Sequence, residues 1–389
     1  MKIMTDKQIQ ITVQALVLTS LVVVAAVLGW GVLDGRLRPG AAQARRGPAS
    51  AAGQAAGSTG SFSAPGAVDG LVLVSADGGA LAVVDPATGE VRAERELSRR
   101  VRSVTPTPGG VSVWVTYADS PEIDVFDTTE LGHETTVVPP SGAGRTPEYL
   151  TFSDTGEVLF VTWAESEVIS AYTHRMRELT LRGEYDAAGT QGPVIRNRRA
   201  SRVFRHDAET GGFAVFFAQN GQRMGTIGVE TERSAVSGTV AAGFDADYSH
   251  LLVGFGSAAD ARVIAERDGA AVELSAVRLS SELGAVPLGA DTNVLAAVGY
   301  DRTQVFLIDA GEQAVITRHA ISGPIAGLAR RGDGSIALLT ETGALYALPA
   351  GRSGEPAARS AISLSGLFSE GVGKVAGFSI SPQGNFACF

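Results

Sequence analysis

The sequence predicts an all-β fold, a seven-bladed β-propeller, preceded by one transmembrane α-helix. The main observation is a phrase of two short apolar runs around a polar turn, of which Phe152–Trp163 (FSDTGEVLFVTW) is the clearest copy. Its copies recur roughly 36 to 56 residues apart, the range expected of four-stranded propeller blades. The seven copies are Thr105–Thr116, Phe152–Trp163, His206–Phe217, Phe244–Phe255, Leu288–Tyr300, Ala329–Thr340 and Phe378–Phe389.

The first blade begins near Val68. Leu71–Ser75 and Ala80–Asp85 are expected to be strands, joined at a hairpin turn of Asp77 and two glycines. A second turn leads into a third strand at Val91–Leu97. The 48 glycines suit many such turns, because glycine adopts positive φ without steric cost.

Ring closure is predicted to join the two ends of the propeller, residues 67–389. The last unit, Lys374–Phe389, supplies one or two strands, while the first unit near Leu71 lacks an inner strand. A composite blade would hide both sheet edges and place Cys388 and Phe389 in strands. Six further blades are expected to start near Val101, Thr146, Ala200, Thr239, Leu288 and Pro324. Eight blades remain the alternative.

Two stretches resemble a known family. Asp85–Val91 (DPATGEV) resembles the D-x-A-T-G-x-V turn of YVTN-type repeat propellers, and Phe152–Glu178 follows the blade order of that family. The Tyr-Val-Thr-Asn tetrapeptide itself is absent, with Phe160–Trp163 (FVTW) as the nearest match. The family includes binding proteins, structural proteins and lactonase-like hydrolases. The resemblance therefore implies a propeller and leaves the activity open.

A membrane anchor is predicted at residues 11–33, after a short tail at 1–10. Ile11 to Leu33 carries no charge and is long enough to cross the roughly 30 Å hydrocarbon core. Trp30 suits the membrane interface, and the spacing of Ala25 and Gly29 suits close packing against another helix. A cleavable signal peptide is disfavoured, because Ala42–Ala44 (AQA) lies about ten residues too far from the apolar segment.

Residues 34–66 form a linker rich in Gly, Ala and Ser, which buries too little apolar surface to fold alone. The charges around the anchor give a mixed signal: Arg36 and Arg38 follow it, whereas Lys2 and Lys7 precede it. A literal positive-inside count places the propeller in the cytoplasm. A short tail before a single anchor is, however, the usual way to tether a domain outside. We therefore expect an inner-membrane protein with its propeller on the periplasmic side.

Composition and motifs argue against several classes of function. A net charge of −9 argues against general nucleic-acid binding, which usually requires a basic surface. The single cysteine excludes a Cys-based zinc site. Asp245 and Asp247 lack the glycine and distal Glu of an EF-hand, so they are read as a turn. No metal or cofactor is expected, because the histidines lack ligand spacing. The five are His133, His174, His206, His250 and His319.

An Arg-rich segment is the candidate docking site. Gly183 to Ser201 is read as an enlarged connection between blades, and five arginines lie at its end. Guanidinium groups suit carboxylates and phosphates, so the cluster fits an acidic partner or lipid headgroups. The alternative is a solvated loop with internal ion pairs. The five residues are Arg196, Arg198, Arg199, Arg202 and Arg205.

These features predict a non-catalytic, membrane-anchored propeller that acts as an accessory or scaffolding subunit of a larger membrane complex. Electron-transfer or photosynthetic assemblies, envelope biogenesis and secretion all fit. One alternative is a lactonase-like hydrolase or a propeller subunit of a periplasmic dehydrogenase. Another is a sensor of a small molecule or cell-wall fragment, which a pocket with mixed aromatic and polar walls would favour.

Overall fold

A computed structural model describes residues 69–379 except 143, 154, 176, 197–200, 211, 228–239, 245–249, 256–259, 268–269, 279–287, 292–293, 300, 332–334, 349–361 and 365. The predicted tail, anchor and linker lie outside the described residues, as do Ala25, Gly29, Trp30, Cys388 and Phe389. Within the described part of the chain, no helix is long and apolar enough to cross a membrane.

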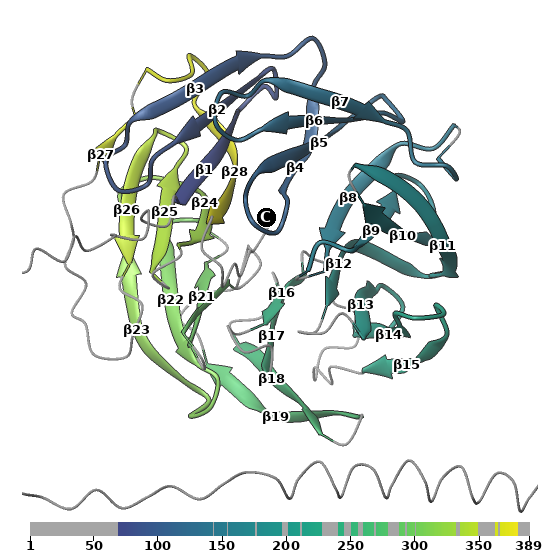
Figure 1. The fold of residues 1–389 in the computed structure, drawn as a ribbon. Coiled ribbons are helices and arrows are strands. Elements are labelled where there is room, and N and C mark those ends of the chain that lie inside the picture. The colour runs from purple at the N-terminus through teal and green to yellow at the C-terminus, as the bar shows by residue number, and fades with distance from the viewer. Residues whose placement is uncertain are drawn as a thin grey trace, which may run out of the picture. The chain divides into compact units, whose positions relative to one another are not determined.

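The described strands pair into seven four-stranded antiparallel sheets, called blades 1 to 7 below (Figure 1). Blade 1 consists of β28 (Val372–Ser379), β1 (Asp69–Ser75), β2 (Ala80–Val84) and β3 (Val91–Glu96). Blade 2 consists of β4 (Val101–Pro106), β5 (Ser112–Tyr117), β6 (Ile123–Asp127) and β7 (His133–Val137). Blade 3 consists of β8 (Pro147–Phe152), β9 (Val158–Trp163), β10 (Val168–Arg175) and β11 (Glu178–Asp186).

The remaining blades follow in chain order. Blade 4 consists of β12 (Thr190–Arg196), β13 (Arg202–Asp207), β14 (Phe213–Phe217) and β15 (Arg223–Ile227). Blade 5 consists of β16 (Val240–Phe244), β17 (His250–Phe255), β18 (Asp260–Arg267) and β19 (Ala270–Arg278). Blade 6 consists of β20 (Leu288–Asp291), β21 (Val294–Val298), β22 (Gln304–Asp309) and β23 (Ala314–Ala320). Blade 7 consists of β24 (Ile325–Arg330), β25 (Ile336–Thr340), β26 (Ala344–Leu348) and β27 (Ile362–Ser363).

In blades 2, 3, 5, 6 and 7 the repeated phrase is the hairpin that joins the first two strands of the blade. Between β8 and β9 the Ser153 amide donates to the carbonyl of Val158 at 2.8 Å, and the Ser153 hydroxyl accepts from the Val158 amide at 3.0 Å. Gly156 closes the turn with a φ of 73°, a conformation that favours glycine. The polar turn therefore fixes the register of the two apolar strands.

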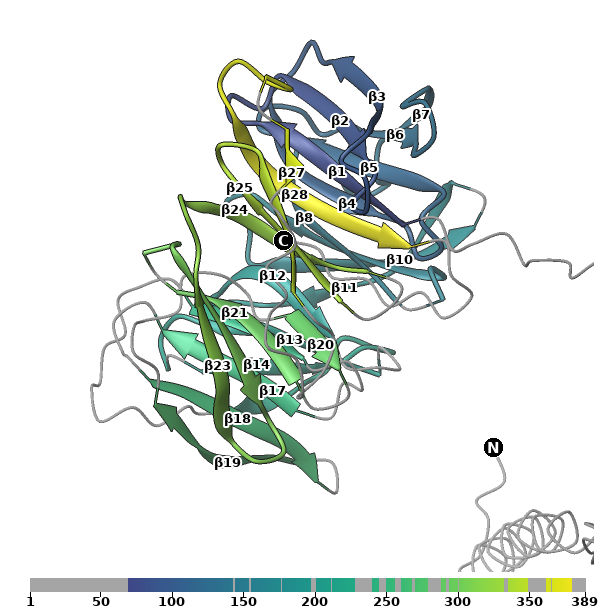
Figure 2. The same cartoon turned by 90° about the vertical axis from the view of Figure 1, so that its left-hand side faces the viewer.

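The predicted composite blade is confirmed. Strand β28 pairs with β1 in a register that runs from Asp69 opposite Ser379 to Ser75 opposite Val372. Figure 2 shows β28, in yellow, alongside β1. Val375 and Ala376 are buried at this junction, so the two ends of the propeller share one hydrophobic core. Closure pairs the edge of β1 that would otherwise remain open.

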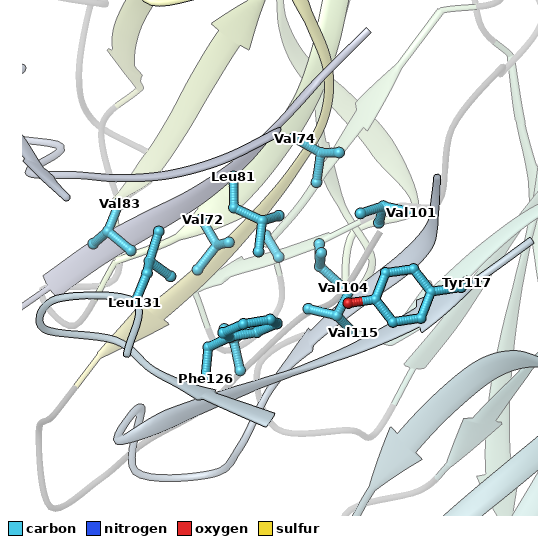
Figure 3. Close-up of a cluster of buried hydrophobic side chains, with 12 residues drawn as sticks. Val72, Val74, Leu81, Val83, Val101, Val104, Val115, Tyr117, Phe126 and Leu131 are labelled. Atoms are coloured by element: carbon cyan, nitrogen blue, oxygen red, sulfur yellow. The ribbon is translucent and has the colours of Figure 1, made fainter. Parts of the chain in front are cut away.

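Hydrophobic clusters between neighbouring blades form the core. Each of the seven clusters joins two blades, and together they connect blades 1 to 7 in sequence and blade 7 back to blade 1. Figure 3 shows the cluster between blades 1 and 2, where Val72 and Leu81 lie close to Val104, Val115 and Phe126. Each such side chain contributes about 1.5 to 3 kcal/mol when fully buried. The closed circuit of interfaces confirms the predicted all-β propeller.

The predicted start of blade 4 is wrong. The segment read as an enlarged connection, Gly183 to Ser201, instead holds the end of β11 and all of β12, the inner strand that was placed near Ala200. Gly192 and Pro193 interrupt the alternation of β12, and its register with β13 shifts between Gln191 and Ile195. Because proline has no N–H to donate to a neighbouring strand, a proline in the sequence disfavours the prediction of a strand. The phrase His206–Phe217 is consequently the β13–β14 hairpin, one strand later than in blade 3.

Candidate functional site

A cavity of about 610 Å³ lies among blades 3, 4 and 5. Blade 3 contributes two residues of β8, the end of β9 and the turn after it. Blade 4 contributes most of β12, part of β13 and Phe213 of β14, and blade 5 contributes Ala242. Strands β8, β12 and β16 are inner strands, the edge strands that contact their counterparts in at least one neighbouring blade. The ionisable and aromatic side chains of the wall are Glu148, Tyr149, Trp163, Glu165, Glu167, Arg205, His206 and Phe213.

Arg205, in β13, is the most unusual group in this wall. Its side chain is only 2% exposed, and it ranks among the largest fully buried side chains of the described structure. Its Nε donates to the carbonyl oxygen of Gly192 at 3.0 Å, whereas its buried Nη1 has no hydrogen-bond partner. Burial lowers the pKa of Arg205, an effect that nearby Glu148 and Tyr149 oppose. A guanidinium still stays charged at neutral pH, so this is a buried cation.

The carboxylate whose charge acts on Arg205 is already engaged. Glu148 Oε1 accepts from Nη1 of Arg102, in β4, at 3.2 Å. The Nζ of Lys374, in β28, in turn donates to the carbonyl oxygen of Arg102. Burial lowers the pKa of Lys374, and nearby Arg102 and Arg100 lower it further. Arg102 thus pairs with Glu148 and lies beside Lys374, whereas Arg205 of blade 4 forms no ion pair among the described residues.

The rest of the wall is mixed. His206 lies beside Phe213, with ring centroids 5.9 Å apart, and its buried Nε2 has no hydrogen-bond partner. Burial lowers the pKa of His206, so the imidazole is neutral at pH 7. Burial also raises the pKa of Tyr149, which keeps its phenol protonated. Glu165 and Glu167 are exposed. The wall therefore combines one buried cation, neutral polar groups, apolar surface and exposed carboxylates.

The predicted Arg cluster is divided by the structure. Arg196 is 8% exposed and donates from Nε to the carbonyl oxygen of Phe152, and Arg205 is buried in the cavity wall. These two side chains do not form a surface patch, because they belong to strands β12 and β13 and not to a solvated loop. Arg202 is half-buried at the start of β13. Arg198 and Arg199 lie outside the described residues, so docking by the cluster stays a prediction.

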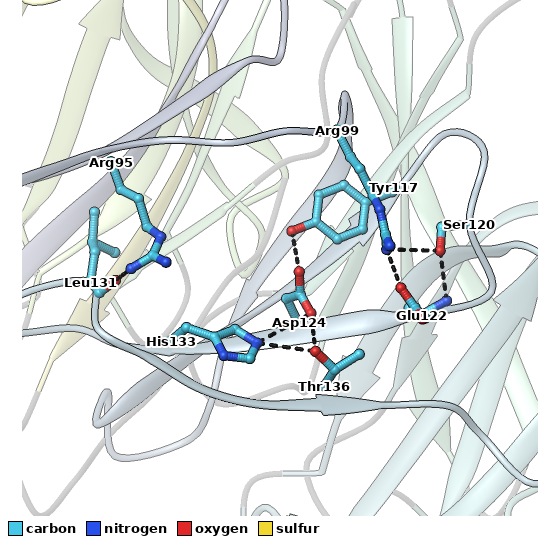
Figure 4. A network of polar contacts seen from close by, with 9 residues as sticks. All are labelled: Arg95, Arg99, Tyr117, Ser120, Glu122, Asp124, Leu131, His133 and Thr136. Carbon is cyan, nitrogen blue, oxygen red and sulfur yellow. Dashed lines mark hydrogen bonds and ion pairs between the residues drawn. The ribbon is translucent and has the colours of Figure 1, made fainter.

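A second polar cluster, in blade 2, offers a contrast (Figure 4). Asp124 accepts hydrogen bonds from the hydroxyls of Tyr117 at 2.7 Å and Thr136 at 2.6 Å, and His133 Nε2 lies 3.4 Å from its Oδ1. Burial raises the pKa of Asp124, but the bonds from Thr136, Tyr117 and His133 outweigh it and leave that pKa below its ordinary value. Arg99 pairs with Glu122 nearby. This cluster ties β5, β6 and β7 together.

Metal-ligating groups do not gather in the described part of the chain. No group of three or more His, Cys, Asp or Glu side chains is placed to hold a metal ion there.

Comparisons with known proteins support the fold alone. No family model matches the chain, and no curated protein matches its sequence. Among solved structures, dihydro-heme d1 dehydrogenase NirN in complex with DHE is 16% identical with a TM-score of 0.53, over 83% of this chain and 70% of its own. Apo AztD from Citrobacter koseri is 8% identical with a TM-score of 0.54, over 82% and 99%. A functionally unknown protein from Desulfotomaculum acetoxidans DSM 771 is 10% identical with a TM-score of 0.59, over 79% and 98%.

Proposed function

We propose that this protein is a membrane-tethered β-propeller that works by binding a small molecule, not by catalysis. The observation that carries the proposal is Arg205, a buried cation in a cavity wall. Its Nη1 donates no hydrogen bond to any protein atom. An unpaired buried charge is costly, so proteins normally pair it. An anionic ligand in contact with the guanidinium would offset this cost.

The cavity suits a small-molecule site in size and chemistry. Its volume of about 610 Å³ falls inside the range of ligand pockets, roughly 300 to 1,000 Å³. Such sites combine apolar walls with a few placed polar groups, as Tyr149, Ile195 and Arg205 do here. The wall is built on strands of three packed blades, so its shape is set before any ligand arrives.

The tether and its consequences come from the sequence. We propose that residues 11–33 span the inner membrane and that residues 34–66 hold the propeller on the periplasmic side. In that position the propeller would serve as an accessory or scaffolding subunit of a larger membrane complex. The uncharged stretch of 23 residues from Ile11 to Leu33 supports this second part of the proposal.

Mild-detergent purification of the full chain tests both parts. Native mass spectrometry should show other membrane subunits on the protein, and a small molecule released on denaturation. A lone monomer with no released molecule would contradict the proposal. Fusions of alkaline phosphatase and of a fluorescent protein to the C-terminus test the side of the membrane, with active phosphatase expected.

A lactonase-like hydrolase is the second candidate, because Glu148, Glu165, Glu167 and His206 line the same cavity. Catalysis by a general base requires that such a group reach the attacked water or substrate within hydrogen-bond distance. Turnover of a panel of sugar lactones by the purified protein, lost in a His206→Gln variant, would favour this candidate over pure binding.

A further inference from the structure

We infer that the cavity takes a small monocarboxylic acid with an apolar body, and that Arg205 holds the carboxylate. This inference deepens the binding role proposed above and rests on it. Three features of the wall carry it: the unpaired guanidinium, the apolar surface beside it, and the exposed carboxylates of the same wall.

The charge of Arg205 favours an anion. Arg102 pairs with Glu148 at 3.2 Å, and Lys374 adds another positive charge beside Arg102. Arg205 therefore remains the cation without a counter-charge in this group, at 2% exposure. A negatively charged group in contact with the guanidinium would supply the missing counter-charge.

The position of the guanidinium favours a planar anion. The hydrogen bond from Nε of Arg205 to the Gly192 carbonyl oxygen, at 3.0 Å, holds one edge of the guanidinium in place. This bond orients the guanidinium plane. A carboxylate is planar and matches the geometry of a guanidinium edge. Because the arginine is already fixed and desolvated, little conformational entropy is lost when the bond forms.

The exposed carboxylates select against multiply charged anions. Glu165 and Glu167 lie in the turn after β9, and both line the cavity. They would repel a phosphate, which carries between one and two negative charges at neutral pH, more strongly than a single carboxylate. Tyr149, Pro193 and Ile195 supply apolar surface for the remainder of the ligand. A ligand with one carboxylate on an aromatic or aliphatic body fits both features of the wall.

Calorimetric titration of the full chain in detergent tests the inference with four probes. Benzoate is the planar aromatic carboxylate, benzamide its neutral counterpart, benzylamine the cation, and inorganic phosphate the multiply charged anion. Benzoate should bind at least about tenfold more tightly than benzamide, because a charge-assisted hydrogen bond is about twice as strong as a neutral one. Benzylamine and phosphate should bind more weakly than both.

Substitutions assign the effect to Arg205. Arg205→Met should weaken benzoate binding at least about tenfold and benzamide binding by a smaller factor. Arg196→Met is the matched control, because Arg196 is a buried arginine of the same blade that does not line the cavity. Glu165→Gln combined with Glu167→Gln should tighten phosphate binding. If Arg205→Met fails to fold, the four-probe series on the unaltered chain still decides.

The possible results separate the inference from the binding role. Equal affinity for benzoate and benzamide, or tighter binding of phosphate or benzylamine than of benzoate, would overturn the carboxylate assignment and leave a binding cavity. Binding of none of the four probes at millimolar concentration would overturn both.

Discussion

The polar cluster of blade 2 and the cavity wall at blades 3 and 4 differ in whether their charged groups have partners within the protein. In blade 2 the Asp124 carboxylate accepts from two hydroxyls, and the nearby Arg99 pairs with Glu122. In the cavity wall Arg205 is more deeply buried, yet one of its N–H groups has no acceptor. The first cluster is complete within the chain and holds strands together. The second leaves a buried cation of the cavity wall without an ion pair among the described residues, which is why we propose a binding site there.

The largest expected effect on stability is in blade 2. Asp124→Ala should lower the free energy of unfolding by about 3 kcal/mol, because it removes the acceptor of the Tyr117 and Thr136 hydroxyls. Urea unfolding followed by fluorescence of the buried Trp114 and Trp163 measures this. Asp119→Ala, at an exposed aspartate of the same blade, is the control and should change little. Equal losses in the two variants would show that the cluster does not stabilise the blade.

A smaller loss should follow removal of one hydroxyl from the complete cluster. Tyr117→Phe deletes the donor that lies 2.7 Å from Asp124 and should cost about 1.5 kcal/mol. Tyr149→Phe is the matched change in the cavity wall, where the hydroxyl makes no hydrogen bond among the described residues. It should leave the urea midpoint unchanged. A loss in Tyr149→Phe as large as in Tyr117→Phe would erase the difference between the two regions.

Removal of the unpaired charge of Arg205 should not lower the free energy of unfolding. Without ligand, Arg205→Met should leave the free energy of unfolding unchanged or raise it by up to about 1 kcal/mol, because an uncompensated buried charge is replaced by an apolar side chain. The same urea experiment measures it. Destabilisation as large as that of Asp124→Ala would mean that Arg205 is a structural group.

The two regions should also respond to acid at different pH. Burial lowers the pKa of His206 in the cavity wall, so its contribution to stability is complete above about pH 6.5 and is lost as the pH falls toward the folded-state pKa. The lowered pKa of Asp124 places its own loss below about pH 4. Urea midpoints between about pH 7 and 5 should therefore fall less steeply in His206→Gln than in the unaltered chain.

Asp124→Asn should leave the slope in this pH window unchanged. Some slope should remain in His206→Gln, because burial also lowers the pKa of His319. Identical slopes in His206→Gln and the unaltered chain would contradict the assignment.

Much of the fold could be predicted from the sequence because it depends on local patterns. The hairpin phrase at Phe152–Trp163 carries its own turn chemistry, and the missing inner strand near Leu71 indicated the pairing of β1 with β28. Strand β12 was missed because Gly192 and Pro193 hide its alternation, and its pairing depends on a shifted register with β13.

The cavity wall could not be predicted in the same way, because its charges meet through distant parts of the chain. Arg102 and Glu148 form an ion pair although they lie 46 positions apart in the sequence. Because Glu148 is engaged in this pair, Arg205 has no ion-pair partner among the described residues. One local signal did exist: Arg205 follows Val203 and Phe204 in a strand that is buried on both faces. A charged residue in such a strand indicates a special role, but only the packed blades show which one.

The most direct test of the account is a crystal structure of the protein with benzoate bound. A carboxylate oxygen should lie about 2.7 to 3.2 Å from a guanidinium nitrogen of Arg205, with the ring against Tyr149 and Ile195. A benzoate seated with its carboxylate away from Arg205, or bound outside the cavity, would contradict the claim that the unpaired arginine makes this wall a binding site.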